Sequence, residues 1–287
     1  ITVELRGGLG NQLFQYAAGI ALSEYHQVDL KVDITQLQEP DEILGTYRRY
    51  CLSNLINEPQ IAQNKNTLYL TNPILKRINK LAPIQFKNVF YENYFHYNPL
   101  IWKTKKSIFL RGNFQSYKYF ENYHNTIINK LAFKQNFNSQ NDATYNQINS
   151  SNSLAIHIRR GDYVSNKIAS HVLGTLAIEH YKNAVDIIIS KERIESVFIF
   201  SDDIEWAKQN LIFLKNPIFV EAFGNYKDIT EFILLKSCKH QIIANSSFSW
   251  WAAWLNQNQN KKVIAPKNWF ADKSLNTKDL IPPSWII

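Results

Sequence analysis

Two arginines at the end of an apolar run have the clearest capacity for chemistry in this sequence. The run at 154–158 (LAIHI) stops at 159–162 (RRGD). An arginine side chain stays charged, and its planar fork matches the geometry of phosphate oxygens. On a strand, His157 points to the same side as Arg159, and Asp162 could hold an arginine in place or bind a hydroxyl group. The pattern favours an anion site over two plainer alternatives, a surface ion-pair cluster and a core histidine.

A glycine-rich loop at 6–12 (RGGLGNQ) lies between an apolar run and a helical pattern. Gly8 and Gly10 allow backbone N–H groups to approach a phosphate or a sugar closely where a helix begins. The third glycine of the dinucleotide fingerprint is missing because Leu13 occupies its position, which disfavours a nicotinamide oxidoreductase. A tight turn without a ligand is the alternative.

Polar side chains also follow two later apolar runs: Asp202, Asp203, Asn245, Ser246 and Ser247. An aspartate here could cap the next helix or accept hydrogen bonds from a base or ribose. The pair lacks the alternating spacing of a metal-binding acidic motif. Hydroxyl groups and backbone amides at the start of the second helix could bind an anion, while its tryptophans are expected in the core.

The second half of the chain alternates short apolar runs with helical patterns. The expected strands are 154–158, 197–200, 217–223, 241–244 and 262–265, and the expected helices are 175–193, 204–211, 226–238 and 247–256. This order predicts a parallel sheet with helices on both faces, and ligands of such sheets lie beyond the carboxyl ends of the strands.

The first half begins in the same way and then becomes harder to interpret. Strands are expected at 1–5, 28–32 and 107–110, and helices at 12–25 and 75–80. The amide-rich stretch 136–152 is the best candidate for a linker. We therefore expect two domains, 1–150 and 151–287.

Composition excludes several classes of protein. The 287 residues are 45% hydrophobic and 20% charged, which is too apolar for a disordered chain. The sequence shows neither a membrane span nor a signal peptide, but it also lacks any Met, so a removed N-terminal segment stays open. Cys51 and Cys238 are far apart and are expected to be buried thiols.

The net charge of +8 comes from short clusters of Lys and Arg in several parts of the chain. None has the signature of a nucleic-acid-binding arm. An anionic substrate and a membrane surface are both compatible partners. Together, the glycine loop, the arginine and the hydroxyl-rich helix start favour a nucleotide-diphosphate site. Without a Walker motif or a metal cluster, a nucleotide-sugar is the expected ligand.

Three motifs together resemble glycosyltransferase family 11, the α-1,2-fucosyltransferases. They are 7–16 (GGLGNQLFQY), 157–163 (HIRRGDY) and 238–251 (CKHQIIANSSFSWW). The resemblance implies an α/β fold of the GT-B type, with two Rossmann-like domains and the active site in the cleft between them. Residues 1–150 would form the acceptor side and residues 151–287 would bind GDP-fucose.

The resemblance also implies a reaction and a set of roles. L-fucose would pass with inversion from GDP-fucose to the 2-hydroxyl of a terminal galactose, without a required metal ion. Arg159 would bind the β-phosphate and His157 would contribute to the nucleotide pocket. The remaining site residues follow by looser analogy: Asp202 or Asp203 for guanine or ribose, Asn245, Ser246 and Ser247 for phosphate, and Gly8, Gly10 and Asn11 for the cleft lining. The catalytic base stays unassigned, with Asp162 one candidate.

Two alternatives stay open at this point. One is a GT-B glycosyltransferase with a different donor or linkage, and the other is a glycan-binding protein that uses its Trp and Tyr residues as sugar platforms. The Asn, Lys and Ile content suggests a bacterium of low GC content. We expect a cytoplasmic enzyme of surface polysaccharide synthesis, such as O-antigen synthesis, with peripheral contact to an anionic membrane and no nucleic-acid partner.

Overall fold

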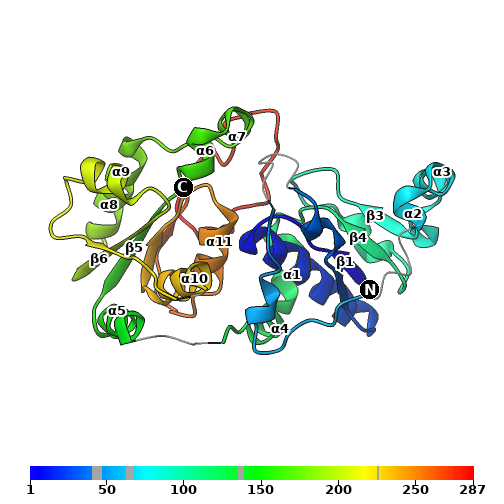
Figure 1. Ribbon diagram of the computed structural model, residues 1–287, viewed down its shortest axis with the longest axis horizontal. Helices are drawn as coiled ribbons and strands as arrows, with labels where there is room; N and C mark the ends of the chain where they lie inside the picture. The colour runs from blue at the N-terminus through cyan, green and yellow to red at the C-terminus, as the bar shows by residue number, and fades with distance from the viewer. Residues whose placement is uncertain (41–46, 63–67, 135–138, 225) are drawn as a thin grey trace. The chain divides into compact units, whose positions relative to one another are not determined.

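The computed structural model describes residues 1–40, 47–62, 68–134, 139–224 and 226–287, except for the side chains at 68, 69, 139, 140, 162, 168 and 169. It divides into two compact units (Figure 1). Unit 1 comprises Ile1–Ala132 and Leu275–Pro282, and unit 2 comprises Phe133–Ser274 and Pro283–Ile287.

Unit 1 is built on a parallel sheet in the order β2-β1-β4-β3. Its strands are β1 (Thr2–Glu4), β2 (Lys31–Asp33), β3 (Val89–Tyr91) and β4 (Phe109–Arg111). The strands expected at the start of the chain and at 107–110 are confirmed, the one expected at 28–32 begins three residues later, and β3 was not predicted. Three-residue strands leave too few residues for an alternating pattern, which is why the sequence was hard to interpret here.

Helix α1 (Leu9–His26) follows β1 and is buried along most of its length. Its first charged residue is Glu24, so it has no charged face until its last turn. Close packing is possible because Gly19 has no side chain: a Cβ atom there would lie 2.9 Å from Leu30 and 3.2 Å from Val3. The other α-helices described in unit 1 are α2 (Leu68–Thr71), α3 (Pro73–Leu81) and α4 (His124–Lys130). Short 3₁₀ turns connect them: η1 (Thr35–Gln38), η2 (Leu52–Asn54), η3 (Ile84–Phe86), η4 (Pro99–Lys103), η5 (Tyr117–Tyr119) and η6 (Glu121–Tyr123).

Unit 2 contains the expected parallel sheet, in the order β7-β6-β5-β8-β9. Its strands are β5 (Ser153–Ile158), β6 (Ser196–Ser201), β7 (Ile218–Phe219), β8 (His240–Ile242) and β9 (Val263–Ile264). The helices are α5 (Ser139–Ser150), α6 (Gly161–Ser165), α7 (Lys167–Val172), α8 (Ile178–Ile189), α9 (Ile204–Asn210), α10 (Lys227–Ser237) and α11 (Ser247–Trp254). The alternation of strands and helices predicted from the sequence is confirmed.

The division between the units differs from the expected one near residue 150. Most of the supposed linker forms helix α5, which packs against α10 inside unit 2; positions 135–138 lie outside the described residues. The buried Asn141 donates from Nδ2 to the carbonyl oxygen of Phe223 (3.1 Å) and accepts from the Phe223 N–H at Oδ1 (3.3 Å). This amide-rich sequence can therefore form a packed helix, because a buried amide side chain forms hydrogen bonds with backbone groups of a loop.

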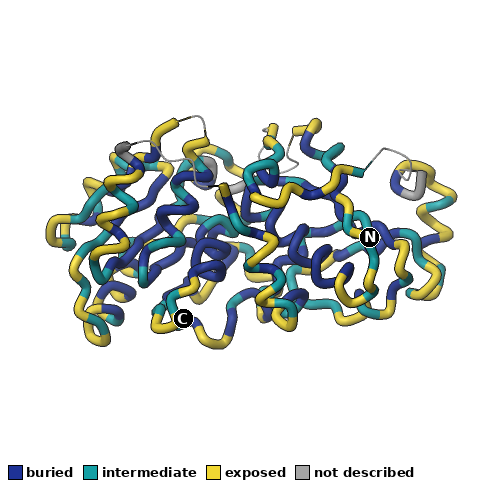
Figure 2. The backbone as a smooth tube through the Cα atoms, turned by 90° about the horizontal axis from the view of Figure 1, so that it is seen from below, coloured by how far each residue is buried: buried dark blue, intermediate teal, exposed yellow. Residues whose placement is uncertain are grey.

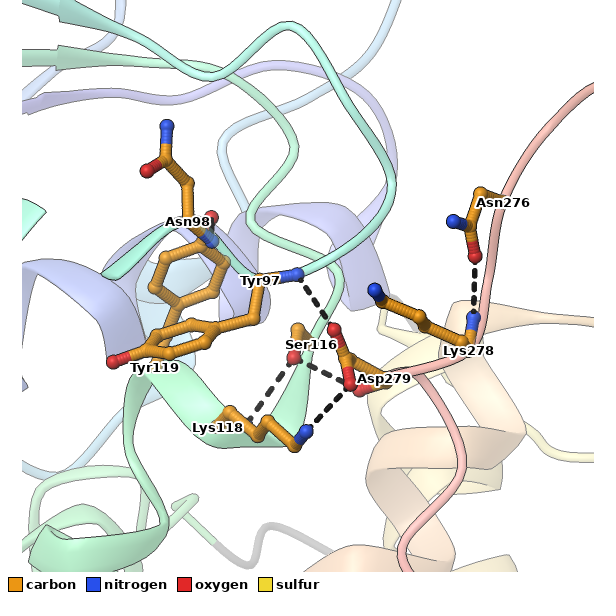
Figure 3. Close-up of polar contacts among 8 residues, drawn as sticks. All are labelled: Tyr97, Asn98, Ser116, Lys118, Tyr119, Asn276, Lys278 and Asp279. Atoms are coloured by element: carbon orange, nitrogen blue, oxygen red, sulfur yellow. Dashed lines mark hydrogen bonds and ion pairs between the residues drawn. The ribbon is translucent and has the colours of Figure 1, made fainter. Parts of the chain in front are cut away.

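The last residues also differ from the expectation, because Leu275–Pro282 belongs to unit 1. Asp279 is buried there and accepts hydrogen bonds from the Tyr97 N–H at Oδ2 (3.2 Å) and from Ser116 Oγ at its backbone oxygen (2.8 Å). Its Oδ1 pairs with Lys118 Nζ at 2.6 Å (Figure 3). The chain then returns to unit 2, where Ile286 bridges to Ile264 of β9. No local sequence pattern marks this crossing.

Buried residues run through the centre of each unit, and exposed residues lie on its loops and outer helix faces (Figure 2). Among the helices described, none has the length and apolar content needed to cross a bilayer.

Candidate active site

Three neighbouring strands of unit 2 end at one edge of the sheet, and the predicted polar residues follow them. In the β5–β6 register Ile158 pairs with Ser201, so Arg159 and Asp202 come next on each strand. In the β5–β8 register Ile156 pairs with Ile242, so Asn245 follows at the same level as Arg159. The parallel register therefore brings together residues that are far apart in the sequence.

Arg159 and Asp202 form an ion pair, with Nη1 and Oδ2 3.0 Å apart. Gly161 makes this arrangement possible, since a Cβ atom there would lie 2.7 Å from the same carboxylate oxygen. The guanidinium also lies 5.5 Å from the ring centroid of Tyr163. Asp202 thus holds Arg159 in place, which is the task that the sequence left open for Asp162. The side chain of Asp162 lies outside those that the structure describes.

The second arginine has a different environment. Arg160 Nε lies 3.2 Å from Asp203 Oδ2, and its guanidinium carbon lies 4.0 Å from the ring centroid of Trp206. Asp203 is also the N-cap of α9, where Oδ1 accepts from the Trp206 N–H at 3.2 Å. These contacts give Arg160 and Asp203 a part in joining β5 to α9. The expected contact of Asp203 with guanine or ribose stays a prediction.

His157 is buried at the end of β5, and its ring centroid lies 5.6 Å from that of Phe248. Burial, and secondarily the charge of Arg159, lower the pKa of His157 to about 3. The imidazole is therefore neutral at physiological pH. Its Nδ1 is buried and has no hydrogen-bond partner among the described residues, so it could serve a ligand.

Glu231, on helix α10, is a site residue that sequence reasoning passed over. Burial raises its pKa to about 7, the nearby charges of Asp202 and Asp228 add to the rise, and Arg159 opposes it. Because the charges of Asp202 and Arg159 act on this carboxyl group, Glu231 is a candidate member of the same site. Its place in the early turns of an expected helix, where acids usually favour the helix dipole, concealed it.

The three residues at the start of α11 that were expected to bind an anion have different surroundings. The Asn245 side-chain nitrogen donates to three backbone carbonyl oxygens, those of Leu173 (2.9 Å), Gly174 (3.0 Å) and Trp269 (3.1 Å). It therefore ties loops together, and its remaining atom, Oδ1, cannot donate to a phosphate. Ser246 and Ser247 begin α11, where first-turn N–H groups lack intrahelical partners, so their predicted phosphate contacts fit this geometry.

In unit 1 the glycine loop follows β1, and the glycine that shapes it is Gly7. Its φ angle is +74°, and a Cβ atom there would lie 2.5 Å from Asn11 Nδ2. A Cβ atom at Gly8 would have no neighbouring atom within 4 Å, and Gly10 lies within α1. Asn11 accepts from Gln115 Nε2 at 3.0 Å, which links the loop to the segment after β4. The predicted roles of Gly8, Gly10 and Asn11 at a ligand stay predictions.

Glu92 is a second residue that the sequence analysis missed. It follows β3 and is buried beside Gly112, because Tyr91 pairs with Arg111 in the register. Its Oε2 accepts from the N–H of Phe114, which has a left-handed φ of 51°. Burial raises the pKa of Glu92 to about 7, although backbone N–H groups and the Tyr119 hydroxyl oppose the rise. Glu92 therefore supports the loop that carries Gln115.

Within the described residues, no group of three or more His, Cys, Asp or Glu side chains could hold a metal ion. The residues near Arg159 are cationic, carboxylate and hydroxyl groups, a combination suited to a phosphate and to a hydrogen-bonding ligand.

Comparison with known proteins agrees with this chemistry. The model of the family described as "Glycosyl transferase family 11" matches residues 1–287. An alpha-1,2-colitosyltransferase of Escherichia coli is 33% identical over 290 residues, covering 100% of this chain and 98% of that protein. The O-antigen biosynthesis glycosyltransferase WbnK of Escherichia coli is 30% identical over 305 residues, with 98% of each chain covered.

More distant relatives include fucosyltransferases. The galactoside 2-alpha-L-fucosyltransferase SEC1 of Bos taurus is 30% identical over 104 residues, covering 36% of this chain and 28% of that protein. The solved structure of NodZ alpha-1,6-fucosyltransferase, a Bradyrhizobium protein, soaked with GDP-fucose has a TM-score of 0.51 at 14% identity, covering 88% of this chain and 91% of that one. That likeness concerns the fold, which is of the GT-B type as the sequence resemblance implied. With the family model matched over its whole length, the chain is a glycosyltransferase and belongs to glycosyl transferase family 11.

Proposed function

We propose that this glycosyltransferase transfers L-fucose from GDP-fucose to the 2-hydroxyl group of a terminal galactose, with inversion and without a required metal ion. The observation that carries the proposal is the Arg159–Asp202 ion pair at the carboxyl end of β5, with Nη1 and Oδ2 3.0 Å apart. It supplies a fixed cation at the edge of the sheet where nucleotides bind in folds of this class.

The chemistry of the reaction suits such a cation. As the bond between fucose and the β-phosphate breaks, negative charge grows on the departing GDP. A guanidinium that is already oriented by Asp202 meets this charge without further reorganisation, as a metal ion would. The N–H groups at the beginning of α11 add dipoles of the same sign. We therefore expect the reaction to need no metal ion, because Arg159 supplies the positive charge.

A base-reading role for Glu231 deepens the donor assignment. Guanine presents two neighbouring donors, its N1–H and its 2-amino group, and a carboxylate can accept from both. Uracil has no such pair of donors. We assign this recognition to the Glu231 carboxylate, and the influence of the Asp202 and Arg159 charges on its pKa supports the assignment.

A second donor deserves a test because of one relative. The Escherichia coli protein that is 33% identical over the full chain is named for colitose. Colitose is 3-deoxy-L-fucose, so a donor site for one sugar differs from a site for the other only around the 3-hydroxyl group. We place fucose first because the motif resemblance and the 30% identity of the Bos taurus protein both concern fucosyltransferases.

The test is calorimetric titration of GDP, GDP-fucose, GDP-colitose, UDP and NADH into protein kept in chelator. Selective binding of the guanine ligands supports the donor class, and a preference between the two GDP-sugars identifies the sugar. Linkage analysis of the product on lactose-type acceptors, still in chelator, then tests the 2-hydroxyl and the metal independence. Binding of UDP or NADH in place of GDP would refute the proposal, and so would a product linked elsewhere on galactose.

A cellular setting follows from the same reasoning. We propose that the enzyme acts on the cytoplasmic side in the synthesis of a bacterial surface polysaccharide. The two full-length relatives, one of which is named for O-antigen biosynthesis, support this setting.

A further inference from the structure

Helix α3 presents an apolar stripe to solvent. Ile74, Ile78 and Leu81 have exposed fractions of 69%, 54% and 76%. Their spacing of four and three residues places them on one face of the helix. Phe86, in η3 just after the helix, is 65% exposed. Exposed apolar side chains that occur singly are ordinary, but four within thirteen residues form a patch that requires a partner.

The apolar stripe is held outward by the opposite side of the helix. Asn79 is the buried residue of α3, and it donates from Nδ2 to the Val89 carbonyl oxygen at 2.9 Å. Its Oδ1 accepts from the backbone N–H groups of Asn88 (2.7 Å) and Val89 (2.9 Å). Asn72 caps the helix start through hydrogen bonds to Ile74 and Leu75. The helix is therefore fixed to the edge strand β3, at the outer edge of the unit 1 sheet (Figures 1 and 2).

Basic side chains occupy other parts of the exposed helix surface, and Arg77 lies beside the stripe, three residues after Ile74 and four before Leu81. Lys76, Arg77 and Lys80 lie on α3 and are exposed, and Lys87 reaches back to the Lys80 carbonyl oxygen at 3.3 Å. We call Ile74, Ile78, Leu81 and Phe86, together with these four cations, the α3 patch. Long cationic side chains on an interfacial helix can extend toward phosphate groups while its apolar stripe enters an apolar layer.

The sequence segment that contains this patch is strongly basic. Residues 59–120 contain ten Lys and Arg and a single acidic residue, Glu92, which is buried. This segment carries a net charge of +9, so the rest of the chain sums to −1 of the total of +8. Two of the ten cations pair with acids outside the segment, Arg111 with Glu4 and Lys118 with Asp279, and the remaining excess lies mainly in this part of unit 1.

We propose that the α3 patch docks the protein on an anionic lipid bilayer. Apolar insertion and attraction to anionic headgroups act together on such an interfacial helix, and each cation near the surface strengthens binding roughly fivefold. A second copy of the chain suits the patch less well, because pairing it with itself would bring four cations against four. This inference does not depend on which sugar or acceptor the enzyme uses.

The test is co-sedimentation of the full chain with vesicles of phosphatidylcholine alone or with about 30% phosphatidylglycerol. We expect binding only to the anionic vesicles, weakening at least tenfold between about 0.05 M and about 0.5 M salt, because salt screens the headgroup charge. Absence of binding to anionic vesicles at low salt would overturn the proposal.

Two sets of variants separate the contributions. The triple change Ile74→Ser, Ile78→Ser and Leu81→Ser removes the stripe, and Lys76→Gln, Arg77→Gln and Lys80→Gln removes three charges. Each should lower vesicle binding tenfold or more without changing the melting temperature by more than a few degrees, because these side chains are exposed. The matched controls are Ile212→Ser, 82% exposed in unit 2, and the triple Lys191→Gln, Lys215→Gln and Lys267→Gln. An equal loss in the controls would contradict a role for the α3 patch.

Insertion can be observed directly. A polarity-sensitive fluorophore on Ile78→Cys should shift to the blue on anionic vesicles, whereas the same label on Ile212→Cys should not. The native cysteines, Cys51 and Cys238, are buried and leave the label specific. A dimer that the triple serine variant dissociates, in sedimentation velocity without lipid, would instead identify the patch as an interface between copies and overturn the bilayer proposal.

Discussion

Two consecutive arginines of unit 2 have separate tasks, and the difference lies in their neighbours. Arg159 is paired with Asp202 at the end of β5, next to the buried His157. Arg160 stacks on Trp206 and pairs with Asp203, the cap of α9. We expect the first to bind the donor phosphate and the second to hold α9 in place, which allows a matched comparison of the two side chains.

Arg159→Lys should lower turnover by roughly 10²–10³, because lysine keeps the charge but loses the planar fork that meets the leaving phosphate. Arg160→Lys, the matched control, should change turnover by no more than about threefold and act mainly on stability. Turnover with GDP-fucose under saturating acceptor measures both. Equal effects of the two substitutions would remove the special role of Arg159.

The pH dependence of donor binding tests Glu231. Its pKa is raised to about 7, and only the ionised carboxylate can accept from both guanine donors. Below that value the carboxyl group is mostly protonated, so the affinity for GDP-fucose should fall up to about tenfold between pH 8 and pH 6. Glu231→Gln should bind weakly at both pH values, without this dependence.

Asp228→Asn provides the companion measurement. The Asp228 charge contributes to the raised pKa of Glu231, so its removal should move the midpoint of the affinity profile to lower pH. Calorimetry across the range would show it. A wild-type affinity that does not change with pH would exclude Glu231 from base recognition.

Glu92 should make the stability of unit 1 pH-dependent. Its folded-state pKa of about 7 lies above the ordinary value of 4.5, so the folded state favours the protonated form. Stability is then fully present below pH 4.5 and is lost as pH rises through 7, by about 3 kcal/mol. Glu92→Gln should flatten this dependence, measured by urea denaturation at several pH values. The exposed Glu121→Gln in the same unit is the control, and it should leave the slope unchanged.

At the scale of elements, tight junctions between strands and helices position the side chains. The β1–α1 junction needs a left-handed residue at Gly7, while Gln12 ties the loop to the backbone of Arg49 and Cys51 through hydrogen bonds of 2.8 and 2.9 Å. The β5–α6 junction needs a residue without a side chain at Gly161 because Asp202 lies so close. In both places a glycine makes room for a polar side chain.

Gly7→Ala and Gly8→Ala form a pair that tests the first junction. Alanine at position 7 would have a strained φ of +74° and would displace Asn11, so it should cost about 2 kcal/mol or more. Alanine at position 8 meets nothing within 4 Å and should change stability by no more than about 0.5 kcal/mol. Urea denaturation compares them, and equal losses would contradict the geometry of the loop.

At the scale of the whole molecule, the chain passes between the units more than once. The C-terminal segment Leu275–Pro282 lies on unit 1, although the residues on both sides of it belong to unit 2. Asp279 anchors it through both carboxylate oxygens and its backbone oxygen (Figure 3). A segment close to the end of the chain therefore contributes to the stability of the first unit.

Asp279→Ala should destabilise unit 1 by about 2 kcal/mol, because it leaves the partly buried Tyr97 N–H and the Lys118 ammonium without their charged acceptor. Hydrogen exchange should rise at the backbone amides of Tyr97 and Lys118 and stay unchanged in the β5–β6 ladder. Lys278→Ala, an exposed neighbour, is the control. Equal exchange in both variants would mean that the segment does not stabilise the unit.

The sequence alone predicted the elements whose signals are local. The alternating strands and helices of unit 2 were recoverable because five continuous apolar runs lie between helical periods. Residues at the strand ends, Arg159 and Asp202 among them, stood out because parallel strands present their carboxyl ends at one edge. The motifs that identified the family are also contiguous segments.

Which of these residues meet depends on how the whole chain folds. The pairing of Arg159 with Asp202 depends on strand register, and the place of Glu231 depends on how α10 packs, so neither is a property of a short segment. Glu92 and Asp279 are ordinary acids in the sequence, and they became anchors because burial left them backbone N–H groups as partners. Local periodicity determines whether a segment is a strand or a helix, whereas contacts across many residues depend on sheet order and packing, which no local pattern encodes.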